Sequence, residues 1–266
     1  MNRLIAFAIV AGAATSALAV PISVWDRNSR ADFDNPGGQV NWLVDGVNQV
    51  FEQRFFYRTA LMNDEVAVDS LPALGPVATD TNPFSDIRPD TLAYQFSDVG
   101  AGLEFEVSFK LRGGLAGSGN SDLAETIIIR NVGNVAQTVS FFQYVDFDLG
   151  NSAGGDVAWI EDGRVAFQGE SNGGIYMSET VAAPAPTFFQ VGLFPTITNL
   201  FGNGVADNLS NNAGPVVGDA SWAFQWDFVV APGSQFTISK DKLIVPAPGA
   251  LALLGLGGLV AGRRRR

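Results

Sequence analysis

The densest group of polar side chains that could do chemistry lies in the stretch DFDLGNSAGGD. Its aspartates Asp146 and Asp148 are two positions apart, and Asn151 and Asp156 follow in a glycine-rich segment. Closely spaced oxygen ligands on a flexible backbone suit Ca²⁺, which takes ~6 to 8 of them. The spacing departs from the EF-hand loop, because Gly150 comes too early and no acid occupies the twelfth place. The stretch therefore predicts either a Ca²⁺ site or a strand end with solvated aspartates and an Asn/Gly turn.

Paired carboxylates are also the machinery of glycoside hydrolysis, in which two acids flank the bond that breaks. Glu104 with Glu106, and Asp146 with Asp148, are pairs two positions apart, and such side chains share one face of a β-strand. Solvated outer faces give the same spacing in any strand with acidic outer positions. A carboxylate-dependent polysaccharide hydrolase or lyase is therefore one alternative that the sequence leaves open.

The aromatic content offers a second alternative, a carbohydrate-binding module. The chain has five Trp, four Tyr and 20 Phe, and aromatic faces stack on the apolar faces of sugars. Trp222 and Trp226 fall on the apolar side of their strand, which indicates core positions. Trp25, Trp42 and Trp159 lie in less regular sequence and are the better candidates for exposure.

Two residue types are absent, and their absence removes several kinds of chemistry. Without histidine there is no Ser-His-Asp or Cys-His machinery and no usual zinc site, and without cysteine there are no disulfides. The net charge is −11, and residues 20–245 keep all 27 acids but only 11 of the 16 basic residues, which leaves −16. Such a surface lacks the basic footprint that nucleic-acid binding needs.

Alternating apolar residues dominate the body and predict an all-β fold. In LEFEVSFKL, residues 103–111, every second side chain from Leu103 is apolar, and ASWAFQWDFVV, residues 220–230, and TVSFFQYVDFD behave similarly. Gly, Asn, Ser and Pro punctuate these runs, as turns require. We expect a β-sandwich of about a dozen short antiparallel strands over residues 20–244.

Both ends of the chain have the composition of targeting segments. Residues 1–19 have one early cation, an apolar run and small residues at Ala17 and Ala19, which predicts a signal peptide cleaved before Val20. At the other end, the 15 residues from Pro248 to Gly262 would reach about 22 Å as a helix, less than the ~30 Å of a bilayer core. Four arginines follow and should stay cytoplasmic, so we expect a short membrane helix of marginal length.

The tail VPAPGALALLGLGGLVAGRRRR, residues 245–266, resembles the PEP-CTERM sorting domain of Gram-negative and related bacteria. It has the proline motif, the apolar helix and the basic cluster of that family, with alanine where glutamate is usual in the motif. The sorting residues that the resemblance assigns are Pro246, Ala247, Pro248, Arg263, Arg264, Arg265 and Arg266. A tail of this kind is also known as the C-terminal domain of an ice-binding protein, a label that concerns the tail alone.

The resemblance implies a substrate of an exosortase-like membrane peptidase, exported by the Sec machinery. Such a protein resides briefly in the inner membrane and then in the periplasm, at the outer surface or in the extracellular matrix. The body is also similar to the uncharacterised globular parts of such proteins, through NWLVDGVNQVFEQRFFYR, GSGNSDLAETIIIRNVG and FFQYVDFDLG.

The sequence alone thus favours an exported, noncatalytic surface or matrix protein that is not an enzyme. We expect it to be associated with the envelope or an exopolysaccharide. Its expected partners are the exosortase-like peptidase, the export machinery and a polysaccharide, and nucleic acid is not expected as a partner. No cofactor is expected apart from the Ca²⁺ alternative. The carbohydrate-binding module and the carboxylate-dependent hydrolase or lyase remain the competing functions.

Overall fold

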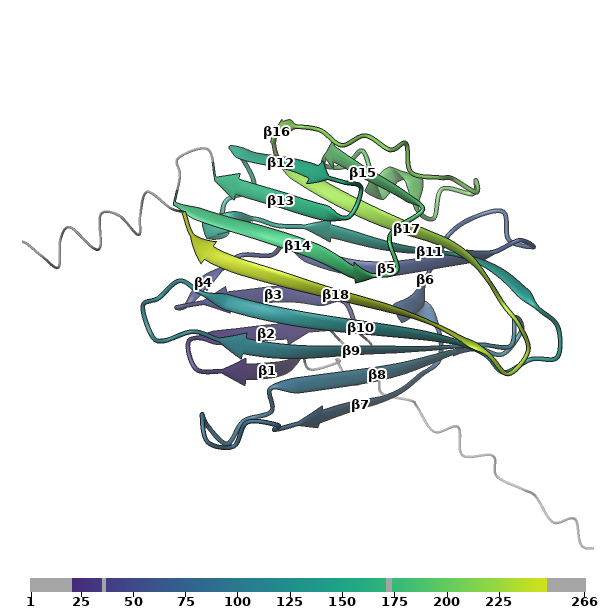
Figure 1. Ribbon diagram of the computed structural model, residues 1–266, viewed down its shortest axis with the longest axis horizontal. Coiled ribbons are helices and arrows are strands. Elements are labelled where there is room, and N and C mark those ends of the chain that lie inside the picture. The colour runs from purple at the N-terminus through teal and green to yellow at the C-terminus, as the bar shows by residue number, and fades with distance from the viewer. Residues whose placement is uncertain (1–20, 35–36, 171–173, 248–266) are drawn as a thin grey trace, which may run out of the picture.

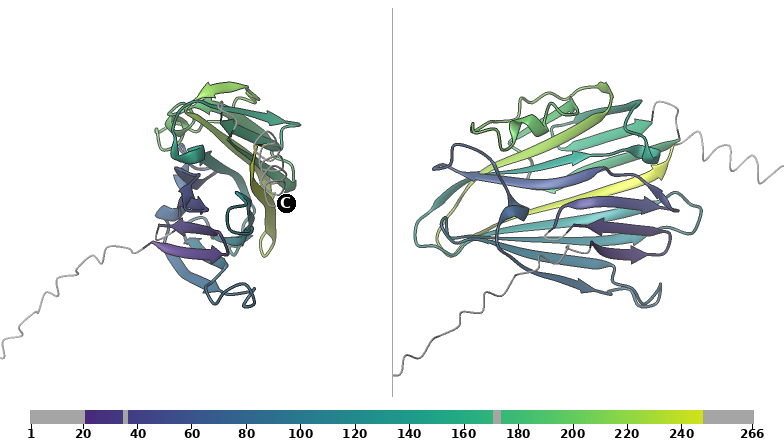
Figure 2. Two further views of the ribbon diagram at one scale, coloured as in Figure 1. Left: turned by 90° about the vertical axis from the view of Figure 1, so that its left-hand side faces the viewer. Right: turned by 180° about the vertical axis from the view of Figure 1, so that it is seen from behind.

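The computed structural model describes residues 21–34, 37–170 and 174–247, and in these ranges the chain is nearly all β. Eighteen strands form two nine-stranded sheets, and their pairings are antiparallel. The sheets are the two layers of a sandwich, seen from three sides in Figures 1 and 2. The predicted all-β sandwich is therefore confirmed, although it has more strands than a dozen and the last strand runs for 12 residues.

Sheet A carries the larger part of the N-terminal chain. Its strands in spatial order are β1 (Ile22–Asp26), β2 (Ser29–Phe33), β3 (Gln39–Val44), β5 (Glu52–Thr59), β11 (Gln137–Asp146), β17 (Ala220–Val230) and β15 (Phe188–Leu193). Two short strands join this sheet, β4 (Val47–Asn48) beside β3 and β6 (Val66–Ala67) beside β5.

Sheet B lies in front in Figure 1 and has an unbranched order. Its strands are β16 (Val216–Gly218), β12 (Asp156–Glu161), β13 (Val165–Glu170), β14 (Ile175–Ala183), β18 (Gln235–Pro246), β10 (Ser121–Asn131), β9 (Leu103–Gly113), β8 (Thr91–Asp98) and β7 (Ala73–Thr79). Because β18 pairs with both β14 and β10, the last strand of the chain sits in the middle of the sheet.

Helical structure in the described ranges is limited to short 3-10 turns. They span Val68–Ser70, Leu149–Asn151 and Thr198–Leu200. The signal helix and the C-terminal apolar helix predicted from the sequence fall on residues 1–20 and 248–266, outside the described residues. Within the part of the chain that the structure describes, no helix has the length and apolarity to cross a membrane.

The strands form where the apolar alternation predicts them, and the alternation decides which side chains are buried. β9 begins at Leu103 and β17 spans 220–230, as the patterns indicate. The inward side chains of the two sheets meet in an aromatic core, in which Phe141 stacks on Phe55 at 5.7 Å between ring centroids. Trp222 and Trp226 belong to this core, as predicted from their positions.

Four ionised side chains lie inside the sandwich, and they form one closed network. Lys240 donates to Glu125 and to Glu179, while Lys242 donates to Glu125 and Gln53. All four charged side chains are 0% exposed, and the two lysines balance the two glutamates. Burial alone would raise the pKa of Glu125, but the two lysines lower it to about 2. The network has its charges paired inside the core and no opening to solvent, so its role is structural.

Candidate active site

Three aspartates meet at one end of sheet A, where two central strands run side by side. Asp146 is the last residue of β11, and Asp148 follows before the turn at Leu149–Asn151. Asp219 lies directly before β17, which pairs with β11 so that Asp146 faces Ser221. One carboxylate oxygen from each aspartate lies within 4.8 Å of the other two. Antiparallel pairing therefore unites acids from two distant stretches of sequence.

Two phenylalanine residues flank these acids and are attached to them through the backbone. The amide of Phe51 donates to the carbonyl of Asp146 at 2.9 Å, and the amide of Phe194 donates to the carbonyl of Asp219 at 2.8 Å. Phe51 is 53% exposed and Phe194 is 43% exposed. Together with Ala153 they line a pocket of about 230 Å³ over the three carboxylates. Exposed aromatic side chains beside carboxylates are the combination that binds a sugar, with ring faces for its C–H groups and acceptors for its hydroxyls.

The Asp146 carboxylate is buried, and only one of its two oxygens has a hydrogen-bond partner. It is 2% exposed, and its Oδ2 accepts a hydrogen bond from Tyr144 Oη at 3.1 Å. Its Oδ1 is buried and has no hydrogen-bond partner. A buried carboxylate oxygen without a partner is costly, so this oxygen is available to a bound ligand, cation or proton.

Crowding of the acids shifts their protonation toward neutral pH. Burial raises the pKa of Asp146 to about 7, and the charges of Asp219, Asp148 and Glu52 add to this effect, while the Tyr144 hydrogen bond opposes it. Burial and the charge of Asp219 also raise the pKa of Asp148. A carboxyl group that exchanges its proton near pH 7 can act as an acid and as a base.

The structure places the four residues of the predicted Ca²⁺ stretch in different surroundings. Asp146 and Asp148 come together, and Asp219 joins them. Asn151 is exposed in a left-handed turn with φ 64°, and the carboxylate of Asp156 accepts from Gln168 Nε2 inside the sandwich. Asp219 was not predicted as a site residue, and its one local signal is its place just before the strongly alternating strand β17.

The outer face of sheet A beside the pocket is covered by a segment that begins at Phe194. Residues 195–212 lie over β5, β11 and β17, where Ile197 and Leu209 pack with Phe142 and Tyr144 in a second apolar cluster. Figure 2 shows this segment beside the ends of β15 and β17. Because Phe194 lies at the start of the segment, the packing of the segment helps to fix one wall of the pocket.

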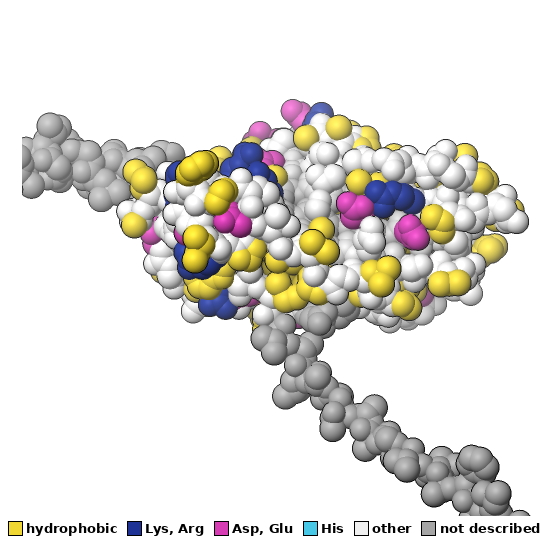
Figure 3. Space-filling model, turned by 90° about the horizontal axis from the view of Figure 1, so that it is seen from below, with side chains coloured by type: hydrophobic (Ala, Val, Ile, Leu, Met, Phe, Trp, Pro, Cys, Tyr) yellow, Lys and Arg dark blue, Asp and Glu magenta, His cyan; other side chains and the backbone are white. Residues whose placement is uncertain are grey.

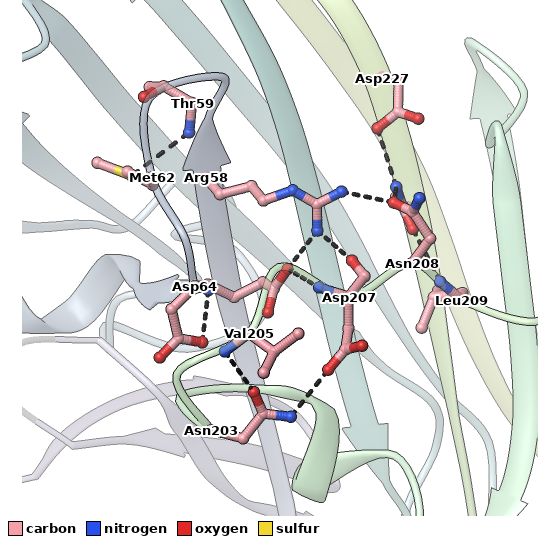
Figure 4. Close-up of polar contacts among 12 residues, drawn as sticks. Arg58, Thr59, Met62, Asp64, Asn203, Val205, Asp207, Asn208, Leu209 and Asp227 are labelled. Atoms are coloured by element: carbon pink, nitrogen blue, oxygen red, sulfur yellow. Dashed lines mark hydrogen bonds and ion pairs between the residues drawn. The ribbon is translucent and has the colours of Figure 1, made fainter.

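Arg58 fastens the far part of the same segment to β5 (Figure 4). Its guanidinium donates to the Glu65 carboxylate and the Asp207 carbonyl, and also to Asn208 Oδ1 at 2.5 Å. Glu65 is 3% exposed, and burial raises its pKa although Arg58 acts in the opposite direction. These contacts join β5 to the covering segment within the same molecule, so we interpret them as a clamp.

The remaining candidate residues are spread over the molecule. Glu106 is on the outer face of sheet B and accepts from Arg130 at 2.9 Å, away from the aspartate pocket. Trp42 is fully buried, contrary to the expectation of exposure. Its indole N–H donates a hydrogen bond to Ser121 Oγ at 2.9 Å, which satisfies this polar group inside the core. Trp25 lies between the guanidinium groups of Arg30 and Arg88.

The predicted sorting residues lie largely beyond the described ranges. Pro246 ends β18 opposite Ile175, and the Ala247 amide donates to the Gly174 carbonyl at 3.2 Å. The other predicted targeting residues are outside the described residues, namely Ala17, Ala19, Pro248, Arg263, Arg264, Arg265 and Arg266. The predicted sorting motif thus starts at the last residue of β18.

The fold of the chain is similar to that of several solved structures. The chain superposes on a bacterial glucoamylase solved with acarbose at a TM-score of 0.56, with 9% sequence identity, over 92% of this chain and 36% of that one. It matches a galactose mutarotase-like protein from Lactobacillus casei at 0.52, with 6% identity, over 85% of this chain and 100% of that one. A galactose mutarotase related enzyme from Lactobacillus acidophilus gives 0.50, with 5% identity, over 85% and 97%. The fold is shared with carbohydrate-active proteins.

These likenesses overturn the leading prediction from the sequence. A noncatalytic surface or matrix protein was expected because no catalytic motif is legible in the chain, yet its fold is one that serves enzymes acting on sugars. The prediction that the chain is not an enzyme is wrong for the same reason. No protein-family model and no curated protein matches the sequence. The chain spans about a third of the glucoamylase, so the likeness concerns only that share of it.

Proposed function

We propose that the protein is a carboxylate-dependent glycoside hydrolase whose active site is the pocket of Asp146, Asp148 and Asp219. The observation that supports it most is the junction of three close carboxylates with two exposed phenylalanine side chains, on a fold shared with sugar-active proteins. A sugar would stack on Phe51 or Phe194 and place its glycosidic oxygen over the acids.

Each carboxylate has a role that follows from its surroundings. Protonated Asp146 gives its proton to the leaving oxygen, since its pKa of about 7 keeps a part of it protonated at neutral pH. An ionised neighbour, Asp148 or Asp219, attacks the anomeric carbon as the glycosidic C–O bond breaks. Water that gives a proton to Asp146 then releases the sugar from this carboxylate. The oxygens of the three aspartates lie within 4.8 Å of one another, closer than the ~6.5 to 9.5 Å that an inverting enzyme needs to admit a water. The separation therefore favours hydrolysis with retention of configuration.

The negative charge of the pocket distinguishes between two candidate reactions, hydrolysis of a neutral sugar and elimination on a uronate. A polysaccharide lyase acts on a uronate, and a uronate carboxylate would meet three aspartates without an opposing cation among the residues that line the pocket. A neutral sugar meets no such repulsion. The pocket thus favours a hydrolase of neutral saccharides over a lyase.

The test is hydrolysis of a panel of neutral polysaccharides and their oligosaccharides. Product formation is measured as the reducing ends that are released. We expect turnover by the wild type and a loss of about a hundredfold or more in Asp146→Asn. Glu104→Gln, a carboxylate on the outer face of β9, is the matched control and should keep full activity. Absence of products with every saccharide would overturn the proposal.

We also propose that the ionised pocket binds Ca²⁺. The unpartnered Oδ1 of Asp146 supports this, as do three carboxylate oxygens close enough for one ion at ~2.3 to 2.6 Å from each. Calcium would compete with the proton on Asp146 and with the sugar for the same oxygens. We therefore expect Ca²⁺ to stabilise the fold and to inhibit turnover.

We infer an export route from the two ends of the chain. The predicted signal peptide, the resemblance to PEP-CTERM tails and the position of Pro246 at the end of β18 support export of an intact sandwich followed by processing by an exosortase-like peptidase. Mass spectrometry of the native protein would record both mature termini. A mature protein that still ends in Arg266 would refute this route.

A further inference from the structure

Three aromatic side chains form a platform on the outer face of sheet B, away from the aspartate pocket. Trp159 on β12, Phe167 on β13 and Tyr176 on β14 are each half-buried. The Trp159 and Phe167 rings stack at 5.2 Å and 27°, and Tyr176 lies 5.9 Å from Phe167 and 6.2 Å from Trp159. This aromatic platform is therefore one contiguous surface drawn from three neighbouring strands.

The sequence builds this platform in a specific way. Trp159 and Phe167 are direct cross-strand partners, and Tyr176 pairs with Gly169. A Cβ atom at Gly169 would lie only 3.3 Å from the Tyr176 ring, so the glycine leaves room for the ring beside β13. The indole N–H of Trp159 donates to Glu161 Oε1 at 2.9 Å, which fixes the orientation of its ring. These contacts hold the platform in one arrangement before any ligand arrives.

The platform is one end of a row that crosses the sheet. From Trp159 and Phe167 the strand register continues through Ser178, Leu243, Asp122 and Arg112 on β14, β18, β10 and β9. Six strands at ~4.8 Å spacing give the row a length of about 24 Å. In Figure 1 these strands lie side by side at the front of the molecule. The row thus begins with aromatic side chains and continues with polar side chains on either side of Leu243.

We propose that this row is a binding track for an extended neutral glycan, with the aromatic platform as its principal subsite. The C–H face of a pyranose with equatorial substituents packs against the parts of the Trp159, Phe167 and Tyr176 rings that remain exposed to solvent. Ser178, Asp122 and Arg112 hydrogen-bond to hydroxyls of the following units.

The charges nearby argue for a neutral glycan. Glu161 lies at the edge of the aromatic platform, and the sequence between the two predicted targeting segments carries a net charge of −16. A polyuronate would be repelled by both at ordinary ionic strength. The track therefore selects chains of the cellulose or xylan type over alginate.

The class of ligand rests on the proposed function, but the surface is a different one. Glycan binding on the row needs neither Asp146 nor Phe194, and hydrolysis needs no contact with Trp159. A failure of one can therefore be distinguished from a failure of the other. Asp146→Asn should still bind the polysaccharide through the row.

Affinity electrophoresis in gels containing hydroxyethylcellulose, xylan or alginate tests the track. We expect the wild type to be retarded by a neutral glycan but not by alginate. Trp159→Ala and Phe167→Ala should each weaken binding about three- to tenfold. Phe84→Ala is the matched control, since Phe84 is 99% exposed in the loop between β7 and β8 at the opposite edge of the sheet. Figure 3, the view from below, shows the hydrophobic side chains spread in small groups over that side.

A second measurement needs no variant and so does not depend on folding of a mutant. Oxidation of tryptophan by N-bromosuccinimide, read by peptide mass spectrometry, should be slowed at Trp159 by the bound glycan and unchanged at Trp25. Equal oxidation of Trp159 with and without the glycan would overturn the proposal. So would unchanged retardation of Trp159→Ala, tighter binding to alginate, or no retardation of the wild type in any gel.

Discussion

Asp146 and Asp219 stand at neighbouring ends of two antiparallel strands, with carboxylate oxygens within 4.8 Å of each other. The same two residues position the aromatic walls of the pocket, because their backbone carbonyl groups accept hydrogen bonds from the amides of Phe51 and Phe194. Acid and aromatic positions are thereby linked through the backbone. A displacement of either strand end would move both the chemistry and the binding surface.

Calcium should raise the melting temperature at pH 8, which is above the pKa of about 7 of Asp146 and leaves this carboxylate able to bind a cation. By mass action, ligand at ~100 times its dissociation constant adds about 2.7 kcal/mol, which is several degrees for a domain of this size. Differential scanning fluorimetry with Ca²⁺ and with EDTA measures the shift. The shift should vanish in Asp219→Asn but persist in Asp156→Asn, and equal melting temperatures for the wild type in Ca²⁺ and EDTA would exclude the site.

Stability should depend on pH through Asp146 and Asp156. Burial raises the pKa of each to about 7 from an ordinary 3.8, so the folded state binds more protons than the unfolded state between these values. The contribution of each group is thus present at low pH and lost as the pH rises through about 7. Urea unfolding at pH 5 and pH 8 should give a smaller fall in unfolding free energy for Asp156→Asn than for the wild type. A fall as large in the variant would contradict this assignment.

Lys242→Met should destabilise the fold strongly. The lysine is 0% exposed and donates to Glu125 and Gln53, so its removal leaves the buried network with an excess of negative charge. We expect a loss of about 3 to 5 kcal/mol in denaturant unfolding. Lys110→Met, on the outer face of β9, should cost less than about 0.5 kcal/mol. Equal effects of the two substitutions would show that the network adds nothing.

Arg58→Ala should release the segment that covers sheet A. The substitution leaves Glu65 buried without its cation and removes the hydrogen bonds of Arg58 to the Asp207 carbonyl and to Asn208 Oδ1 shown in Figure 4. Hydrogen exchange of the amides at residues 203–209 should become at least about tenfold faster. Arg88→Ala removes an exposed ion pair with Asp86 and should leave these amides unchanged. Protection that survives in Arg58→Ala would mean that apolar packing alone holds the segment.

The fold was predictable from the sequence because burial of one face of each strand produces an alternation of apolar residues along the local sequence. Each side chain of β9 or β17 alternates between core and outer face, so the period of two marks the strand without knowledge of its partner. Trp42 was misplaced because its hydrogen-bond partner Ser121 lies on a strand of the other sheet. Nothing local distinguishes a tryptophan whose N–H is satisfied in the core from one that faces solvent.

The site was only half predictable, for a related reason. Asp146 and Asp148 are visible as a pair in one strand end, but Asp219, Phe51 and Phe194 reach the pocket through pairing and turns that no local pattern specifies. The noncatalytic interpretation failed in the same way. It depended on the lack of a legible motif, whereas this pocket is assembled from separate strands.

The hydrolysis rate of the wild type beside that of Asp219→Asn tests the central claim most directly, because only the folded chain places Asp219 at the pocket. On a neutral oligosaccharide that the wild type cleaves, with reducing ends measured over time, we expect the variant to lose about a hundredfold or more in kcat while melting at a similar temperature. Cleavage by Asp219→Asn at the wild-type rate would contradict the account.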